Sequence, residues 1–476
     1  MNCPQSAPWG DAECVSGKRE FATRDKAPKH HLAVQLTRSC ETLSDWIGTT
    51  MLSFPVVKNP PEATMPSEVD LLGLGEQWRL VMTGRLSFPK AAAIWTVLAC
   101  ITISDEGVAD HQNVSVEPLA AYKKLEPSSV TVSGISSGAF FAHQFHVAYS
   151  SLVKGVGIVA GGPYACADQV DSITPPLGNP FFVALVPRRV VASLAVCTHF
   201  GRSDFKQAGW QFPGKPDADD SQKAAIRSHA EKMIDDPGNL ANSRVWLFHG
   251  DKDMGVPKST MQELRNFYQK MGVPAGNIAV KDGPDAKHGM PIKALPSGES
   301  GRHCKLPDPS FLVRCDYGAA ELLLRHLYPD ASPASVSSPG SGRIVGFDQT
   351  EFFDETERST SLHESGYLYV PAACENRSES GTKCRLHVAF HGCEQDVGRI
   401  HDLFFRDAGY NDWADANDVI VLYPQATPWL RLADLSQISG NPKGCWDWWG
   451  YSGDDYLGRD GKQMRAVREM IGRLLP

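Results

Sequence analysis

The chain has 476 residues, 42% hydrophobic and 21% charged, so it is long enough to bury a full-sized core without the help of a metal. Its formal net charge is −8, which argues against a nucleic-acid partner because phosphate binding needs a concentrated basic surface. The 12 cysteines form no CxxC pair and no Cys/His spacing of the zinc-finger type, so we expect disulfides in an oxidising compartment, with neither a metal nor a cofactor. The alternative is a scatter of buried free thiols.

The first part of the chain contains an internal segment with the features of a secretion signal. Residues 82–105 start at Met82 with basic residues and continue into an apolar stretch, 91–103, about half as long as a bilayer span. We therefore expect a signal peptide at 82–105, a secreted extracellular protein and no stable membrane span. Residues 1–81, which lack a helix or strand period, would be a disordered leader or an extension upstream of the true start. A small extra domain with a buried helix is the alternative, and a lipid anchor at Cys100 stays open.

The strongest catalytic motif follows a short β-branched run. Residues 128–133 (SSVTVS) predict a strand, GISSG at 134–138 predicts a tight turn, and 139–145 predict a helix. This is the pattern of a nucleophile elbow, whose glycines permit a strained turn that exposes the serine hydroxyl. Ser136 is the predicted nucleophile. A GxSxG string alone is a weak signal, and the alternative is a Gly/Ser turn without chemistry.

A carboxylate and a histidine follow the serine, so the chain order is Ser, Asp, His, which differs from the order in chymotrypsin and in subtilisin. The buried-strand run 244–248 ends in a loop that carries Asp251 and Asp253, of which we favour Asp253 as the acid. An Asp that only satisfies turn amides is the alternative for either residue. His288 lies on a loop after the short strand 278–280 and is the predicted base.

A Pro/Ser/Gly linker at 329–342 divides the region from 117 onward into two segments. Two domains would be the default interpretation, but the second segment has too few strands for a sheet of its own. It contains the apolar strand 385–390, which runs into a turn whose Cys393 amide can point at a substrate oxygen. The Ser137 amide would be the second oxyanion donor.

The second segment resembles the amino-terminal half of the polyhydroxybutyrate depolymerases and related feruloyl esterases. The resemblance rests on HVAFHGCEQ at 387–395, the strand 419–424 and GCWDWW at 444–449. In that family this half precedes the elbow, whereas here its last helix, 463–475, ends the chain. The sequence thus resembles the circularly permuted, single-domain depolymerases over about 117–476. The resemblance implies an α/β-hydrolase fold with a mostly parallel central sheet flanked by helices.

The resemblance also implies roles for individual residues. It assigns catalysis to Ser136, Asp253 and His288, and the oxyanion hole to Ser137 and Cys393. Aromatic side chains that could stack on a polyester chain, unless they form a Trp-rich core corner, are Trp446, Trp448, Trp449 and Tyr451, with Trp449 or Trp448 as the exposed one. Spacing fits four disulfides, although it cannot fix connectivity: Cys166 with Cys197, Cys304 with Cys315, Cys374 with Cys384, and Cys393 with Cys445.

The implied function is a secreted serine esterase that hydrolyses poly(3-hydroxybutyrate), or a similar polyester, to hydroxy-acid monomers or oligomers through an acyl-enzyme. We expect a monomer whose partner is the ester substrate. One alternative is a feruloyl or acetyl esterase that acts on plant polysaccharide. Another is an inactive homologue that only binds a surface.

Overall fold

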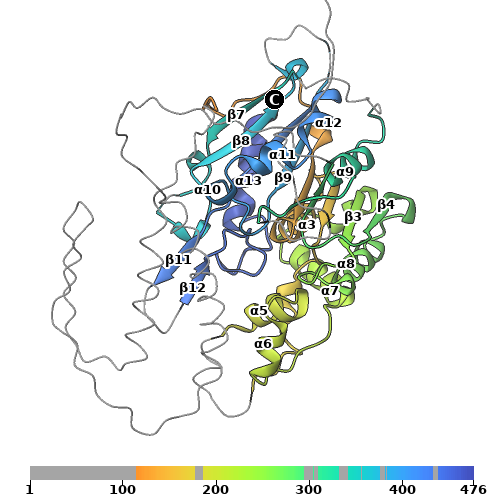
Figure 1. Ribbon diagram of the computed structural model, residues 1–476, viewed down its shortest axis with the longest axis vertical. Helices are drawn as coiled ribbons and strands as arrows, with labels where there is room; N and C mark the ends of the chain where they lie inside the picture. Colours follow the sequence, from red (N-terminus) through yellow and green to blue (C-terminus); the bar gives the residue numbers. More distant parts are fainter. Residues whose placement is uncertain are drawn as a thin grey trace, which may run out of the picture. The chain divides into compact units, whose positions relative to one another are not determined.

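The computed structural model describes residues 114–176, 186–293, 304, 309–331, 341–354, 356–375, 381, 383–432 and 438–476 (Figure 1). The expected leader (1–81), the signal peptide (82–105) with Cys100, and most of the linker (329–342) lie outside the described residues and stay predictions. Among the helices of the described part, none is both long and apolar enough to cross a membrane.

Within the described residues, one mixed sheet has eight strands in the order β4-β3-β2-β1-β9-β10-β8-β7. The strands from β4 to β10 in this order run parallel, whereas β8 is antiparallel to both of its neighbours. Their bounds are β1 (Thr131–Ile135), β2 (Gly155–Val159), β3 (Arg244–Gly250), β4 (Ile278–Gly283), β7 (Arg343–Asp348), β8 (Ser365–Val370), β9 (Arg385–Phe390) and β10 (Val419–Tyr423). The described part of the chain also has two small strand pairs outside this sheet: β5 (Met290–Ile292) with β6 (Leu312–Arg314), and β11 (Trp429–Leu432) with β12 (Ile438–Asn441).

Helices cover both faces of the sheet because its strands are apolar on both sides. In β3, Val245 and Leu247 belong to one buried cluster, whereas Trp246 and Phe248 belong to another on the opposite face. The first cluster is covered by α3 (Ser137–Ala148), α7 (Ala218–Ala230), α8 (Lys258–Lys270) and α13 (Lys462–Leu474). The second is covered by α9 (Ala319–Leu327), α11 (Leu403–Asp407) and α12 (Asn411–Ala416). Three short helices complete the list: α5 (Arg188–Val191), α6 (Arg202–Gln207) and α10 (Val397–Ile400).

The two segments on either side of the linker build this one sheet together. Strand β1 of the first segment pairs in parallel with β9 of the second, Thr131 opposite His387. If the strands are renumbered 1 to 8 in the sequence β7, β8, β9, β10, β1, β2, β3, β4, their order across the sheet is 1-2-4-3-5-6-7-8. In this numbering β9, which leads to the turn of Cys393, precedes β1, which leads to Ser136. The Tyr122 amide donates to the Leu474 carbonyl at 2.9 Å, so the end of α13 lies beside the segment that leads into β1. The prediction of a circularly permuted α/β sheet is confirmed.

A buried polar network crosses the seam between the two segments. The ring nitrogens of His387 lie 2.7 Å from the hydroxyls of Thr131 and Ser133, and Ser133 lies 2.8 Å from the Tyr410 hydroxyl. Burial lowers the pKa of His387 to about 3, so its imidazole is neutral at pH 7. A shift of one residue between β1 and β9 would leave these buried groups without partners, so the network fixes the register.

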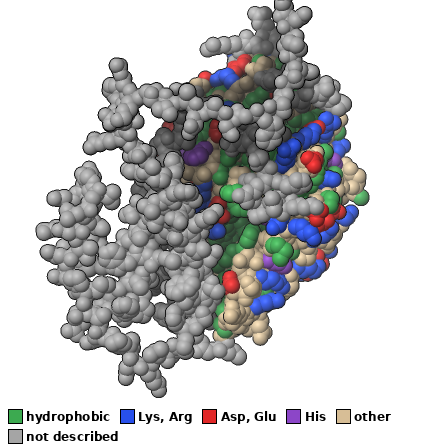
Figure 2. Space-filling model, in the orientation of Figure 1, with side chains coloured by type: hydrophobic (Ala, Val, Ile, Leu, Met, Phe, Trp, Pro, Cys, Tyr) green, Lys and Arg blue, Asp and Glu red, His purple; other side chains and the backbone are tan. Residues whose placement is uncertain are grey.

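Basic, acidic and apolar side chains are interspersed over the described part of the face in Figure 2. Among the ion pairs of the described residues, Lys258 pairs with both Asp251 and Asp282. Exposed pairs of this kind each contribute little to stability.

Candidate active site

Ser136 occupies a strained turn between β1 and α3. Its backbone has φ 54° and ψ −122°, a conformation that residues other than glycine rarely adopt. The turn is held by hydrogen bonds on both sides: the Ser136 amide donates to the Val159 carbonyl at 2.9 Å, and its carbonyl accepts from the amides of Ala139 and Phe140. This geometry is that of a nucleophile elbow.

The glycines of GISSG are required by close backbone approach. A Cβ atom on Gly134 would lie 2.2 Å from the Gly138 carbonyl oxygen, and one on Gly138 would lie 2.2 Å from the His391 carbonyl oxygen. The second contact brings the turn after β9 directly against the first turn of α3. The two glycines therefore allow the elbow to form and to meet the other segment.

Ser136, His288 and Asp253 form one hydrogen-bonded chain. His288 Nε2 lies 3.0 Å from Ser136 Oγ, and His288 Nδ1 lies 2.8 Å from Asp253 Oδ2. The Asp253 side chain is 1% exposed and that of His288 is 14% exposed. The second Asp253 oxygen accepts from the amides of Gly255 (2.8 Å) and Val256 (2.9 Å). The carboxylate is thus fixed in position, and it orients the imidazole toward the serine.

The environment keeps Asp253 ionised. Burial would raise the pKa of this carboxyl, but the charge and hydrogen bond of His288, together with the amides of Val256 and Gly255, hold it below its usual value. Asp251, the other carboxylate that the sequence allowed, is 42% exposed and faces Lys258. The structure places only Asp253 against the imidazole.

Parallel strands bring these distant residues together. Ser136 follows β1, Asp253 follows β3, His288 follows β4, and the carboxyl ends of parallel strands meet at the same edge of a sheet. The loops of the acid and the base are also bonded to each other, since the Lys252 amide donates to the Ala286 carbonyl at 2.9 Å.

The turn after β9 lies against the serine from the other segment. A Cβ atom on Gly392 would lie 3.3 Å from Ser136 Cβ. The Gly392 amide donates to Gln395 Oε1, while Gln395 Nε2 donates to the Ser310 carbonyl, so that this glutamine braces the turn. The next amide, that of Cys393, has no acceptor among the described residues. It is therefore available to a ligand, as is the amide of Ser137 at the start of α3, which likewise has no acceptor among the described residues.

The structure corrects part of the expected aromatic surface. Trp446 is fully buried between Phe141 and Phe390, and Trp448 is 5% exposed and stacks on Phe140 at 4.0 Å. Both rings thus form the core corner that was the alternative interpretation, and Trp448 is not an exposed ring; that either ring binds substrate stays a prediction. Of the two rings proposed as the exposed one, only Trp449 is partly exposed.

Tyr451 is partly buried, and its hydroxyl is engaged within the protein. It donates to the Cys445 carbonyl at 2.7 Å and accepts from Asn441 and Gln463. Its ring lies 4.9 Å from that of Trp449. Tyr451 therefore supports Trp449 from within the protein.

All four expected cysteine pairs are joined in the structure: Cys166–Cys197, Cys304–Cys315, Cys374–Cys384 and Cys393–Cys445. The last pair ties the turn after β9 to the Trp segment. The Trp446 amide in turn donates to Ser137 Oγ at 3.3 Å, so the disulfide and this hydrogen bond together link the turn after β9, the Trp segment and α3.

Sequence reasoning missed three apolar side chains near the site. Phe200 and Phe311 contact the His288 ring, and Met254, next to Asp253, is 83% exposed. They lie on irregular loops, where no period or motif marks them. No cluster of His, Cys, Asp and Glu that could hold a metal occurs among the described residues.

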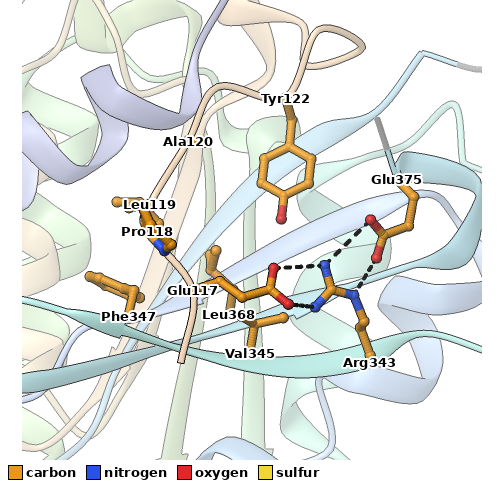
Figure 3. Close-up of a pocket in the computed structure, with 10 residues that line it drawn as sticks. All are labelled: Glu117, Pro118, Leu119, Ala120, Tyr122, Arg343, Val345, Phe347, Leu368 and Glu375. Atoms are coloured by element: carbon orange, nitrogen blue, oxygen red, sulfur yellow. Dashed lines mark hydrogen bonds and ion pairs between the residues drawn. The ribbon is translucent and has the colours of Figure 1, made fainter. Parts of the chain in front are cut away.

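A pocket of about 440 Å³ lies elsewhere, at the β7 and β8 edge of the sheet (Figure 3). The guanidinium of Arg343, which lines this pocket, donates to Glu117 at 2.7 and 3.1 Å and also pairs with Glu375. Because both carboxylates neutralise Arg343, these groups attach the segment before β1 to β7. The hydrogen-bonded chain at Ser136 is separate from this pocket.

The comparisons with known proteins find polyhydroxybutyrate depolymerases. The chain is 32% identical to a poly(3-hydroxybutyrate) depolymerase of Delftia acidovorans over 390 residues, 82% of this chain and 66% of that protein. It is 29% identical to a polyhydroxybutyrate depolymerase of Talaromyces funiculosus over 369 residues, 76% of this chain and 94% of that protein. No family model matches the chain.

Two solved structures are similar over 75% of this chain and 99% of theirs. One is the crystal structure of a PHB depolymerase from Penicillium funiculosum, at 28% identity and a TM-score of 0.60. The other is a serine-to-alanine variant of a PHB depolymerase in complex with an R3HB trimer, at 27% identity and a TM-score of 0.61. With the permuted sheet and the elbow, these similarities show that the chain belongs to the polyhydroxybutyrate depolymerase family of α/β hydrolases.

Proposed function

We propose that the protein is a serine esterase that hydrolyses poly(3-hydroxybutyrate), or a closely similar polyester, to hydroxy-acid monomers or oligomers. The observation that carries the proposal is the hydrogen-bonded chain from Ser136 Oγ through His288 to Asp253. Two relatives named as depolymerases, and a related structure that holds an R3HB trimer, support the substrate class.

In the acylation step, His288 Nε2 takes the proton of Ser136 Oγ as the oxygen attacks the ester carbonyl carbon. Asp253 stabilises the imidazolium that forms. The tetrahedral intermediate then collapses: its bond to the leaving alcohol oxygen breaks, and His288 gives that oxygen the proton. The products are an acyl-Ser136 ester and a free hydroxyl group on the departing polyester end.

In the second step, water replaces the departed alcohol. His288 takes a proton from the water as the water attacks the acyl carbon, and returns it to Ser136 Oγ as the bond between the acyl group and the serine breaks. A carboxylic acid leaves, and the enzyme is restored. We assign the oxyanion donors to the amides of Ser137 and Cys393, each worth about 2.7–4 kcal/mol of barrier on the scale of measured oxyanion holes.

The test is hydrolysis of a polyhydroxybutyrate suspension by Ser136→Ala. Clearing should fall by roughly a millionfold, as it does when a triad serine is removed. Ser203→Ala, an exposed serine on α6, is the matched control and should retain full activity. Hydrolysis that survives Ser136→Ala would contradict the esterase mechanism, whereas release of ferulate without clearing of the polymer would contradict the substrate class.

We also propose that the protein acts outside the cell after removal of residues 82–105. The four disulfides support this proposal, since disulfides persist in oxidising compartments. Sequencing the amino terminus of the protein from culture supernatant is the test. A mature chain that begins near residue 1 would contradict it.

A further inference from the structure

Two phenylalanine rings lie beside the imidazole of His288. The Phe200 ring centre is 5.5 Å from that of the imidazole, and the Phe311 ring centre is 6.2 Å from it. Both rings meet the imidazole nearly edge-on, at interplanar angles of 84° and 80°. The proposed base therefore has two aromatic neighbours that take no part in its hydrogen-bonded chain.

Phe200 is exposed but fixed in place. Its side chain is 58% exposed, and it lies so close to Gly255 that a Cβ atom there would be 2.3 Å from the ring. The neighbouring His199 amide donates to the Gly255 carbonyl at 2.7 Å, and Cys197 is held by its disulfide. The ring rests on the loop that orients Asp253, so it cannot withdraw in that direction to admit a larger group.

Phe311 is held beside the base in an unfavourable backbone conformation. Its φ of 53° is an outlier for a bulky residue, and such outliers tend to persist at active sites and ligand clamps. The Phe311 carbonyl accepts from the Met290 amide at 2.7 Å, and the β6 strand that follows leads into the disulfide of Cys315. Both rings thus have anchored backbones.

The chemistry of the proposed reaction says which part of the substrate these rings would meet. During acylation His288 protonates the leaving alcohol oxygen, so the atoms attached to that oxygen must lie next to the imidazole. In a polyester of hydroxy acids, these atoms include the carbon that carries the alkyl side chain. Phenylalanine rings at this position match an alkyl group, and they carry no donor or acceptor for the hydroxyl groups of a sugar.

We propose that Phe200 and Phe311 form the subsite for the leaving hydroxy-acid unit and restrict its side chain to a short alkyl group. This inference rests on the proposed function and names the part of the substrate that is selected. It concerns the alcohol side of the scissile bond only, because the acyl side faces the oxyanion amides.

The experiment compares two dimer esters that share the (R)-3-hydroxybutyryl acyl group. The alcohol unit is methyl (R)-3-hydroxybutyrate in one and methyl (R)-3-hydroxyoctanoate in the other. The unmodified protein should prefer the first in kcat/KM, and Phe200→Ala should lower that preference by about tenfold or more, the scale of a few methylenes in an apolar pocket. Phe311→Ala should shift it in the same direction. Ile226→Ala, which removes a 55% exposed apolar side chain from α7, should leave the preference unchanged.

A second measurement separates specificity from support of the base. The alcohol has left before deacylation, so the rate at which water hydrolyses the acyl-enzyme should be the same in Phe200→Ala as in the unmodified protein, whereas loss of support for the base would lower this rate. An equal loss of kcat/KM on both dimers, or an unchanged preference in both variants, would overturn the inference while leaving the esterase function intact. If the unmodified protein cleaves neither dimer and no polymer, the proposed function itself fails.

Discussion

The Tyr122 amide donates a hydrogen bond to the Leu474 carbonyl across 2.9 Å, so the last helix of the chain ends where its first catalytic segment begins. The end of α13 and the segment that leads into β1 are therefore adjacent, as a circular permutation requires. A chain that passes directly from α13 into β1 could build the same sheet with different termini.

A variant that joins residue 474 to residue 121 by a short Gly/Ser link, and starts and ends within 332–340, should therefore fold. We expect kcat/KM within about tenfold of the parent, because loop closure changes by only a small entropy term. Far-UV circular dichroism and polymer clearing check this. As the control, opening the chain between Val388 and Ala389 in the central strand β9 should abolish folding. A rejoined variant that does not fold would contradict the proposed route through the sheet.

Asp253→Asn should lower kcat by about four orders of magnitude with little loss of folding stability. The amide keeps the shape of the carboxylate, but it cannot hold the imidazole in the required tautomer or stabilise its charge. Single-turnover kinetics on a soluble ester measure the effect. Asp251→Asn, at the exposed carboxylate two residues earlier, is the matched control and should change kcat by less than about threefold. Equal losses in the two variants would remove Asp253 from the role of acid.

Gly138→Ala should reduce both stability and activity. The added methyl group would lie 2.2 Å from the His391 carbonyl oxygen, so the elbow and the turn after β9 must separate. Such overpacking costs about 1–3 kcal/mol. Urea unfolding and kcat/KM measure the two effects. Gly276→Ala is the control, because nothing lies within 4 Å of a Cβ atom at that glycine. A fully active Gly138→Ala variant would show that the two turns do not need this contact.

Stability should fall as the pH is lowered from about 6.5 toward 5. Burial lowers the pKa of His143 to about 4, and that of His146 and of His387 to about 3. Between these values and the ordinary histidine pKa the unfolded chain binds more protons than the folded one. Acid therefore favours unfolding, and the loss continues until the pH reaches the folded-state pKa values.

Three such histidines change the free energy of unfolding by up to about 4 kcal/mol per pH unit once these histidines are fully protonated in the unfolded chain. Urea unfolding at pH 7, 6 and 5 measures it while most carboxylates stay ionised. His387→Gln should lower the slope by about 1.4 kcal/mol per pH unit, and His229→Gln, on the exposed surface of α7, is the control. A stability that does not change between pH 7 and 5 would mean that these imidazoles are not buried.

The sequence by itself determined the elements that depend on neighbouring residues. The β-branched run before Ser136, its glycines and the following helix are local signals, and the strands before Asp253 and before Cys393 have clear apolar runs. The alternation of strands and helices predicted an α/β sheet, whereas its permuted order was implied by the resemblance to the depolymerase family. Four cysteine pairs could be proposed from spacing together with family resemblance.

Only the tertiary structure decided which of these side chains meet and which are exposed. It placed Asp253 rather than Asp251 on His288, buried Trp446 and Trp448, and brought Phe200 to the base. Burial depends on what packs against a residue from distant parts of the chain. The local pattern predicts burial along an apolar strand such as 244–248, but it does not decide burial in loops or in the Trp-rich turn.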